Sequence, residues 1–345
     1  MPTMSELGEK TFLKALLPAL YVDPTFVNGF GHDASIVDVG LQEHIAIKID
    51  RAPYPVALKK GIGDYRTWGR LAVAANVSDL LAVGASPRAL ILSLVLPGSF
   101  DAVSAGEIVK GCEEACITHG VAFVGGDTKE GAAAQVIGAA FGTVAKGYGF
   151  GRANAASGDY LYVAGQLGAF SGVVAMLDAS DSCKLPPVEW ADVLTRPSAR
   201  VREGEYLRKL GSVIAACDLS DGLAEAIRIF CKAGTGITVD EANLPIHRIA
   251  VEAATRLQVP AWRFAFGVGD WAIAFVAKYM DVAILDDLRN KGLEIFKIGR
   301  FNDSGKRLVR SRNGVKFELP DLINEQFRQR IEDGDDYISQ LLHKR

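Results

Sequence analysis

The chain contains 345 residues, of which 49% are hydrophobic and 23% are charged, and its formal net charge is -3. This length exceeds what one ordinary hydrophobic core holds, so we expect two domains. The near-neutral charge argues against a nucleic-acid-binding protein, which would carry a clustered basic surface, and leaves small anionic substrates compatible with the composition.

The N-terminal residues and the cysteines indicate a cytoplasmic protein. Residues 1–6 are acidic and polar and lack the basic and apolar regions of a secretory signal. Gly, Asp and Lys interrupt every apolar run before it reaches the length of a membrane span. The five cysteines are an odd number at irregular spacing, as expected for reduced thiols.

Residues 1–150 combine strands and helices in an order typical of an α+β domain. Leucines at helical spacing between residues 9 and 20 predict an amphipathic helix that packs on the body of the protein. The elements predicted after it are strands at 35–39 and 44–49, a helix at 65–83, a strand at 89–96, a helix at 102–119, and strands at 121–124 and 135–144. This order suggests a sheet with helices stacked on one face.

A glycine-rich stretch at 147–151 predicts a linker between two domains, which would comprise residues 1–150 and 151–345. Strands and helices continue beyond it in the pattern of an α/β domain. The predicted strands lie at 160–163, 213–217, 236–239, 271–276 and 296–298, and the helices at 170–177, 199–210, 223–232, 246–257 and 281–291. A further strand pair and a charged helix at 322–342 are predicted to close the chain.

Five segments place an aspartate beside glycine or serine at the point where an apolar stretch ends. They are Gly31-His32-Asp33-Ala34, Asn76-Val77-Ser78-Asp79, Gly125-Gly126-Asp127-Thr128, Asp218-Leu219-Ser220-Asp221-Gly222 and Gly267-Val268-Gly269-Asp270. Mg²⁺ takes oxygen ligands and is usually held by one or two carboxylates together with substrate phosphates. One such turn alone is more typical of a helix cap. Five of them indicate a nucleotide enzyme that uses Mg²⁺.

A zinc site is not expected. Cys112 and Cys116 lie one helical turn apart in the predicted helix that ends near His119, but no second cluster of ligands follows them. Packing of these side chains explains the spacing better than metal binding.

As an ordered series, the segments resemble the thiamine-monophosphate kinase branch of the aminoimidazole-ribonucleotide-synthetase-like (PurM-like) superfamily. The resemblance covers most of the chain and includes Leu7-Gly8-Glu9, Gly31-His32-Asp33-Ala34, Asn76-Val77-Ser78-Asp79, Gly84-Ala85-Ser86-Pro87, Gly125-Gly126-Asp127-Thr128, Arg196-Pro197-Ser198-Ala199-Arg200 and Asp218-Leu219-Ser220-Asp221. It implies an N-terminal domain whose sheet forms a homodimer, a C-terminal α/β domain, and ATP in the cleft between them.

The resemblance also implies a role for each matching residue. The Mg²⁺ ions that bridge the ATP phosphates would be held by Asp33, Asp50, Asp79, Asp127 and Asp221. ATP would be bound with the help of Gly125, Gly126, Thr128, Asp218, Ser220 and Arg200, and the small acceptor would be bound by Asp270 and Trp271. Asp127 and Asp221 would be catalytic through the metal ions, because divalent cations neutralise the phosphates and stabilise charge on the transferred phosphoryl group.

The chain departs from the kinase pattern near the expected acceptor. After Asp50 the kinases carry an acidic, aromatic segment, and this chain has Arg51-Ala52-Pro53-Tyr54-Pro55 instead. The charge order at Lys129 and Glu130 also differs, and Gly269 stands where the kinases have a glutamate. The sequence therefore supports nucleotide use more strongly than thiamine monophosphate as the acceptor.

Several alternatives stay open. Selenophosphate synthetase and the hydrogenase-maturation dehydratase need reactive cysteines near one end of the chain, and the pattern lacks them. An α-ribazole kinase, a cyclo-ligase and, in a different class, a non-catalytic nucleotide-binding scaffold remain. A scaffold has no need of so many mutually repelling carboxylates, which favours the enzyme. His32 can bind phosphate or lie in a solvated turn, and Trp271 can stack on an acceptor or belong to the core.

Overall fold

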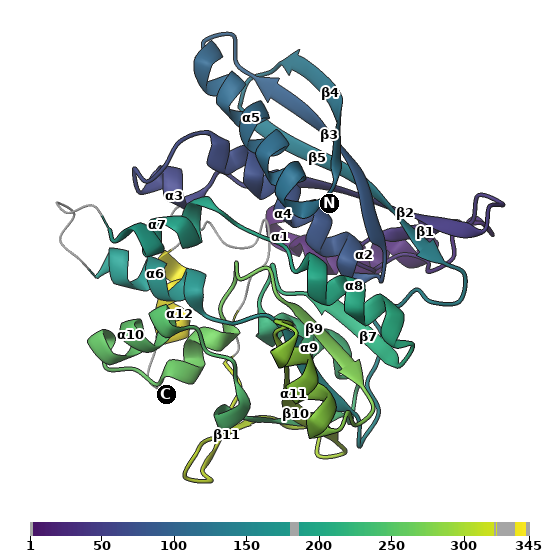
Figure 1. Cartoon of the computed structure of the whole chain (residues 1–345), viewed down its shortest axis with the longest axis vertical. Helices are drawn as coiled ribbons and strands as arrows, with labels where there is room; N and C mark the ends of the chain where they lie inside the picture. Colours follow the sequence, from purple (N-terminus) through teal and green to yellow (C-terminus); the bar gives the residue numbers. More distant parts are fainter. Residues whose placement is uncertain (1–2, 180–185, 321, 323–334, 343–345) are drawn as a thin grey trace.

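The computed structural model describes residues 3–179, 186–320, 322 and 335–342. These residues form two β-sheets with helices, which is the α+β architecture that the sequence predicts (Figure 1). No helix in the described ranges is long and apolar enough to cross a bilayer.

The first sheet has five strands in the order β1-β2-β5-β3-β4. The strands are β1 (Ser35–Val37), β2 (Glu43–Ala52), β3 (Ser86–Leu96), β4 (Ala122–Glu130) and β5 (Gln135–Ala145). Neighbouring strands are antiparallel except β3 and β4, which are parallel because helix α5 (Ala102–His119) connects them. Strand β4 is an edge strand, since β3 is its one partner in the sheet.

Helices α4 (Arg66–Ala82) and α5 lie together at one face of this sheet. They cross closely at two glycines. A Cβ atom on Gly69 would lie 1.9 Å from the carbonyl oxygen of Ile108, and one on Gly111 would lie 2.1 Å from that of Arg66. Only glycine permits this approach, so the small residues in α4 fix how deeply the helix sits.

The opposite face of the first sheet is apolar and exposed. Ile47 and Ile49 of β2 are 48% and 68% exposed, Ile91 of β3 is 48% exposed, and Phe141 of β5 is 42% exposed. Cross-strand pairing places Ile47 opposite Phe141, and Ile49 and Ile91 both opposite Ala139, so these side chains are neighbours. An apolar patch of this kind on a regular sheet marks an interaction surface.

The second sheet has seven strands in the order β12-β11-β8-β10-β6-β9-β7. The strands are β6 (Tyr160–Ala164), β7 (Val213–Asp218), β8 (Gly236–Asp240), β9 (Ile273–Ala277), β10 (Ile295–Asn302), β11 (Arg307–Arg310) and β12 (Lys316–Glu318). The α-helices of this half are α6 (Ala169–Asp178), α7 (Val188–Thr195), α8 (Val201–Leu210), α9 (Leu223–Phe230), α10 (Arg248–Leu257), α11 (Val282–Asn290) and α12 (Asp335–Leu342).

Helix α4 is the element that joins the two halves. Its side chains belong to a hydrophobic cluster that also contains residues of the first sheet, such as Leu90, and of the second sheet, such as Phe275. Fourteen of its residues are buried, from Thr67 to Ala82. The second sheet packs its other face on a separate cluster that includes Phe230 and Phe264. The helix therefore holds the ends of strands from both sheets near one another.

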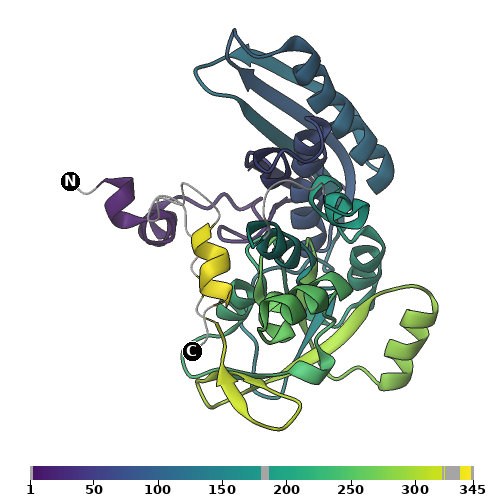
Figure 2. The ribbon, with the colours of Figure 1, turned by 90° about the vertical axis from the view of Figure 1, so that its left-hand side faces the viewer.

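The predicted helix at 9–20 has a different environment from the one expected. It forms α2 (Glu9–Leu16) and the short helix η1 (Leu17–Ala19), but neither contains a buried residue. Leu13 and Leu16 are 36% and 38% exposed, and Figure 2 shows the N-terminal helices standing away from both sheets. The expectation that its leucines pack on the body was wrong, because the leucine spacing gives the apolar face of a helix without giving what covers it. Lys10 of this helix does contact the body, through an ion pair with Glu225 of α9 at 2.7 Å.

The helices and strands of the structure differ from the predicted ones in three further places. Strand β4 continues through Gly125 and Gly126, where the sequence predicted a turn. Helix α7 and the short helices α1 (Met4–Leu7) and α3 (Val56–Lys59) were not predicted. The predicted helix at 322–342 is described as α12 over Asp335–Leu342, and most of its remaining residues lie outside the described ranges.

Candidate functional site

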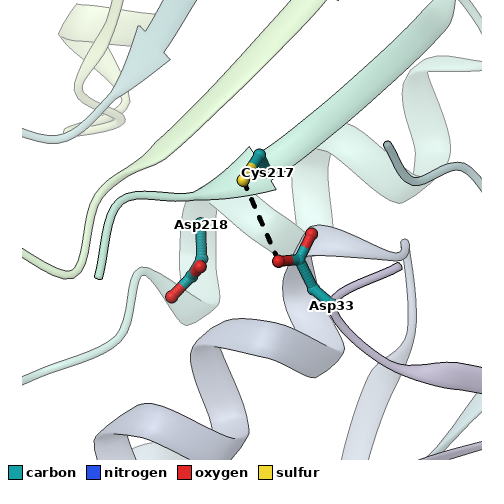
Figure 3. Close-up of side chains that lie close together, drawn as sticks. All are labelled: Asp33, Cys217 and Asp218. Carbon is teal, nitrogen blue, oxygen red and sulfur yellow. Dashed lines mark hydrogen bonds between the residues drawn. The ribbon is translucent and has the colours of Figure 1, made fainter. Parts of the chain in front are cut away.

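Three buried aspartates meet where the two halves join. Asp33 precedes β1, Asp79 lies on α4, and Asp218 ends β7. Their residues are 3%, 5% and 4% exposed. Figure 3 shows the side chains of Asp33 and Asp218 together with Cys217, and one potential ligand atom from each of these three lies within 4.8 Å of the others.

The loop of Asp33 is held by polar contacts on both sides. The Asn28 side chain donates a hydrogen bond to the carbonyl oxygen of Ala34 and accepts one from the N–H of Ile36, each at 2.9 Å. Nδ1 of His32 accepts a hydrogen bond from the backbone N–H of Arg152 at 3.0 Å. His32 therefore anchors the segment that carries Arg152, which supports a structural role for this histidine.

Arg152 forms an ion pair with Asp33. Its guanidinium donates to Oδ1 of Asp33 from Nη2 at 2.6 Å and from Nε at 3.1 Å. The Sγ atom of Cys217 lies 3.9 Å from the same oxygen. Oδ2 of Asp33 has no hydrogen-bond partner although it is buried.

Asp79 has its own cation. Nζ of Lys48 donates to Oδ2 of Asp79 at 2.7 Å. Burial on its own would lower the pKa of Lys48, but the neighbouring carboxylates, Asp79 first among them, raise it overall. Burial raises the pKa of Asp79, and so does the negative charge of Asp218, while Lys48 acts in the opposite direction.

Asp218 keeps one unsatisfied oxygen. Its Oδ1 accepts a hydrogen bond from the hydroxyl of Ser220 at 3.1 Å, whereas its buried Oδ2 has no partner. Burial, followed by the negative charges of Asp33 and Asp221, raises the pKa of Asp218 to about 7. Asp221 is exposed beside the cluster, at the start of the segment that leads into α9.

The donor set of this cluster fits Mg²⁺. Buried polar atoms are normally paired, and an unpaired carboxylate oxygen in a native protein calls for a partner such as an ion. Oδ2 of Asp33 and Oδ2 of Asp218 are two such atoms within one group. Carboxylate oxygens are the ligands that Mg²⁺ prefers, and a bound cation offsets the burial and the mutual repulsion that raise the pKa values of Asp79 and Asp218.

Asp50 and Asp127 occupy different parts of the first sheet. Asp50 lies on the same face of β2 as Lys48, next to the cluster. Register pairs Asp50 with Gly138 of β5, Gly138 with Leu92 of β3, and Leu92 with Gly126 of β4. Asp50 on β2 and Asp127 on β4 are therefore three strands apart, and at about 4.8 Å per strand this is a separation of about 14 Å. Within one chain, no single ion can contact both carboxylates.

Asp127 is also exposed. Its side chain is 62% exposed and lies 3.9 Å from Nζ of Lys129, which is 72% exposed. Thr128 follows it on the same exposed edge strand. Gly126 is required by the sheet itself, since a Cβ atom there would lie 1.8 Å from the carbonyl oxygen of Leu92. Gly125 has a φ of +112°, which favours glycine.

The remaining predicted residues lie in a second polar group. Asp270 accepts hydrogen bonds from the N–H groups of Gly168 at 2.6 Å and Phe170 at 3.2 Å, so it caps the start of α6. Burial of the carboxylate raises the pKa of Asp270 to about 6. Arg200 pairs with Glu294 at 3.3 Å and contributes to the field at Asp270. The structure thus brings Arg200 to Asp270 and not to the buried aspartates.

Trp271 has an unusual backbone conformation beside the cluster. Its φ is +51°, and among the described residues only Gln258 shares a positive φ without being glycine. The carbonyl oxygen of Ala272 accepts a hydrogen bond from the N–H of Leu219 at 2.9 Å, so the Trp271 segment adjoins the end of β7. Strain of this kind is concentrated at functional sites.

Two residues of the site were not foreseen, Lys48 and Arg152. A signal existed for Lys48, because strict alternation in β2 puts Lys48 on the covered face together with Ala46 and Asp50. A lysine at a covered position is rare unless it is paired. Arg152 lies in the glycine-rich segment between the sheets, where periodicity gives no information.

A cavity of about 760 Å³ lies elsewhere, on the second sheet. Its lining includes Tyr160, Lys297, Arg300 and Arg310, and it contains none of the predicted site residues. We therefore take the buried aspartates, with their unpaired oxygens, and not this cavity as the candidate functional site.

Comparison with known proteins shows which family this chain resembles. Residues 31–144 match the family model of AIR synthase related protein, N-terminal domain. The thiamine-monophosphate kinase of Escherichia coli O157:H7 is 30% identical over 300 residues, which cover 84% of this chain and 89% of that protein. That of Methanospirillum hungatei is 28% identical over 244 residues, covering 69% and 75%.

Solved structures of thiamine-monophosphate kinases share the fold of this chain. AaThiL complexed with AMPPCP and TMP has a TM-score of 0.74 and 23% identity over 92% of this chain and 97% of that chain. Thiamine-monophosphate kinase from Stenotrophomonas maltophilia K279a has a TM-score of 0.68 and 26% identity over 83% and 91%.

The fold and these relatives identify the chain as an ATP-dependent kinase of the PurM-like superfamily. Within that class, the chain belongs to the thiamine-monophosphate kinase family. The resemblance that the ordered segments suggested is confirmed.

Proposed function

We propose that the protein is a Mg²⁺-dependent ATP phosphotransferase whose ion is held by Asp33 and Asp218. The observation that carries this proposal is the pair of buried carboxylate oxygens without a partner, one on each residue. Asp79 and the exposed Asp221 flank them and add negative charge. When bound, Mg²⁺ neutralises phosphate charge and stabilises the charge that develops on the transferred group.

The other residues of the site position the carboxylates. Ser220 donates to Asp218 and fixes the direction of its free oxygen. Arg152 holds Asp33 in the same way and is itself 33% exposed, so its outer edge can meet an anionic phosphate. Catalysis then depends on positioning and on electrostatic stabilisation and requires no covalent nucleophile.

We propose that Asp127 and Thr128 act on ATP from a separate position, on β4. Asp127 is about 14 Å from the row of Asp50 by strand spacing, so it serves a different ion or a different part of the nucleotide. Its exposure leaves it accessible to a ligand or to a second chain.

The acceptor that we propose is a small heteroaromatic or nucleoside-like compound, with thiamine monophosphate as the first named candidate. The family supports this choice, and Trp271, whose backbone adjoins the end of β7, has an aromatic side chain that an acceptor ring can stack on. At Gly269 a Cβ atom would lie 2.7 Å from the ring of Phe170, and φ is +84°. A glutamate is therefore strained there, which favours testing a nucleoside such as α-ribazole as a second candidate.

The test is ATP consumption with thiamine monophosphate, α-ribazole and related nucleosides, compared between wild type and Asp218→Asn. We expect product with one acceptor from wild type and none from the variant. Asp286→Asn on α11 is the matched control, since its carboxylate is 54% exposed and pairs with Arg289. ATP turnover that is absent with every acceptor would support a nucleotide-binding scaffold instead.

We also propose a homodimer that forms through the apolar face of the first sheet. Ile47, Ile49, Ile91 and Phe141 would be covered by the same residues of a second copy, as a two-fold interface requires. Sedimentation velocity should show a dimer for wild type and a monomer for Ile49→Asp. An unchanged sedimentation coefficient in the variant would contradict this interface.

A cytoplasmic location and a domain boundary near residue 150 complete the proposal. The four cysteines of the described ranges are free thiols, as in a reducing compartment. The strands of the two sheets lie on either side of residue 150. Limited proteolysis that cleaves first in 147–158 would support that boundary, and early cleavage inside either sheet would contradict it.

A further inference from the structure

Lys48 is an uncommon residue for its position. Strand β2 alternates between a face toward α4, with Ala46, Lys48 and Asp50, and an outer face with Ile47 and Ile49. The side chain of Lys48 is 23% exposed and points at the cluster of aspartates. A buried ammonium group is retained where it is paired, and here its partner is the carboxylate of Asp79, whose side chain is 7% exposed.

Two positively charged side chains, Lys48 and Arg152, already occupy some of the carboxylate oxygens in the cluster and leave others open. Lys48 satisfies Oδ2 of Asp79 and also lies in the field of Asp50 and Asp218. Arg152 satisfies Oδ1 of Asp33. Two fully buried carboxylate oxygens of the cluster have no hydrogen-bond partner, Oδ2 of Asp33 and Oδ2 of Asp218. The open position for an ion is therefore between Asp33 and Asp218, and not at the Asp79 oxygen that Lys48 already occupies.

We propose that Lys48 is a permanent cation that takes the position of one divalent ion at Asp79, so that this chain binds one ion fewer than its carboxylates could hold. The inference rests on the proposed use of Mg²⁺. An ion bound to Asp79 would lie within a few ångströms of the ammonium, and like charges at that distance repel strongly in a buried site. Lys48 thereby sets the number of ions in the site.

The experiment counts bound Mn²⁺ per chain by the electron paramagnetic resonance of the free ion, with a non-hydrolysable ATP analogue present. Lys48→Thr and Lys48→Gln both remove the charge, and the glutamine keeps most of the side-chain length. Lys48→Arg keeps the charge. Lys146→Thr is the control, since Lys146 forms an exposed pair with Asp38 at 3.3 Å and lies at the end of the same sheet.

We expect one additional Mn²⁺ in Lys48→Thr and in Lys48→Gln, and the wild-type number in Lys48→Arg and in Lys146→Thr. Thermal melting gives a readout that is independent of turnover. The two neutral variants should melt lower than wild type without metal, because Asp79 loses its cation, and Mn²⁺ should raise their melting temperature more than it raises that of wild type.

A double variant locates the additional ion. Lys48→Thr with Asp79→Asn removes both charges and should return to the wild-type number of ions. Equal numbers in wild type and both neutral variants would overturn the inference, and so would an additional ion that persists in the double variant. If Lys48→Thr does not fold, the comparison of Lys48→Gln with wild type decides. A wild-type protein that binds no Mn²⁺ would contradict the proposed Mg²⁺ dependence, whereas the difference between variants tests Lys48 separately.

Discussion

Asp218 and Asp127 both belong to segments that place an aspartate near glycine or serine, yet one residue is buried and the other is exposed to solvent. Asp218 ends β7 where α4 covers the strand, and its residue is 4% exposed. Asp127 lies on the edge strand β4, and its side chain is 62% exposed. The burial of Asp218 costs free energy that a bound cation recovers, while Asp127 has water as an alternative partner. This contrast is why we propose the buried group as the ion-binding part of the site, and why we expect a ligand or a second chain to cover β4.

The largest effect is expected from Asp218→Asn. Loss of this ligand should weaken binding of Mg²⁺ with a non-hydrolysable ATP analogue by at least about 100-fold, measured by calorimetry. The free energy of unfolding without metal should not fall, because a buried charge is removed. A variant that binds the complex as wild type does would show that the buried group is not the ion site. Asp286→Asn serves again as the control.

Arg152→Met should come next. It leaves Asp33 buried without its cation, and we expect the free energy of unfolding to fall by about 2 kcal/mol, less than for a fully buried pair because Arg152 is 33% exposed. Urea denaturation measures this change, and Mg²⁺ should restore part of it. The exposed Arg289→Met gives the baseline. If the two variants were equally stable, the ion pair of Arg152 with Asp33 would contribute no more to stability than the exposed pair of Arg289 with Asp286.

A smaller effect concerns pH. The pKa of Asp218 is raised to about 7, so in the metal-free protein this carboxyl holds a proton that the unfolded chain releases near pH 4. Stability without metal should therefore fall as pH rises from about 4 to about 7. A cation must displace the same proton, so Mn²⁺ affinity should increase by up to about tenfold per pH unit toward pH 7 and then level off.

The pH profile of Asp218→Asn is the control for this prediction. The variant lacks the titrating carboxyl, so its residual affinity for Mn²⁺ should change less with pH than that of wild type. A wild-type affinity that is flat between pH 5 and pH 7 would contradict the assignment of Asp218.

The smallest change in stability is expected for Asp127→Asn. Because Asp127 is exposed, we expect the free energy of unfolding to change by no more than about 0.5 kcal/mol. ATP turnover should nevertheless be lost if Asp127 acts on the nucleotide as proposed. A stability loss as large as that of Arg152→Met would show that the edge strand is covered in the working protein, and full turnover would remove Asp127 from the site.

Local patterns in the sequence were sufficient for most of the elements. The helix predicted at 102–119 matches α5 (Ala102–His119), because Asp101 caps its start and Gly120 ends it in a left-handed conformation. The predicted strand at 160–163 is part of β6, because here too a local signal, a glycine turn followed by an apolar run, marks where the element begins. The α+β class followed from the order of such elements.

The positions and partners of the site residues depend on tertiary contacts, and these could not be predicted from the sequence alone. The separation of Asp127 from Asp50 follows from the strand order, which crosses the sequence order. The capping role of Asp270 depends on α6, which lies about 100 positions away in the chain. The pairing of Lys48 with Asp79 joins a strand to a helix and leaves no trace in local spacing.

Helix α4 has a consequence for how the enzyme can move. Since it belongs to a cluster shared by both sheets, a hinge between the halves would have to expose side chains such as Leu80 and Leu81, both 0% exposed. Opening at this position is costly, so the halves behave as one rigid frame. We therefore expect nucleotide entry and product exit to depend on movement of the peripheral loops and not on separation of the two sheets.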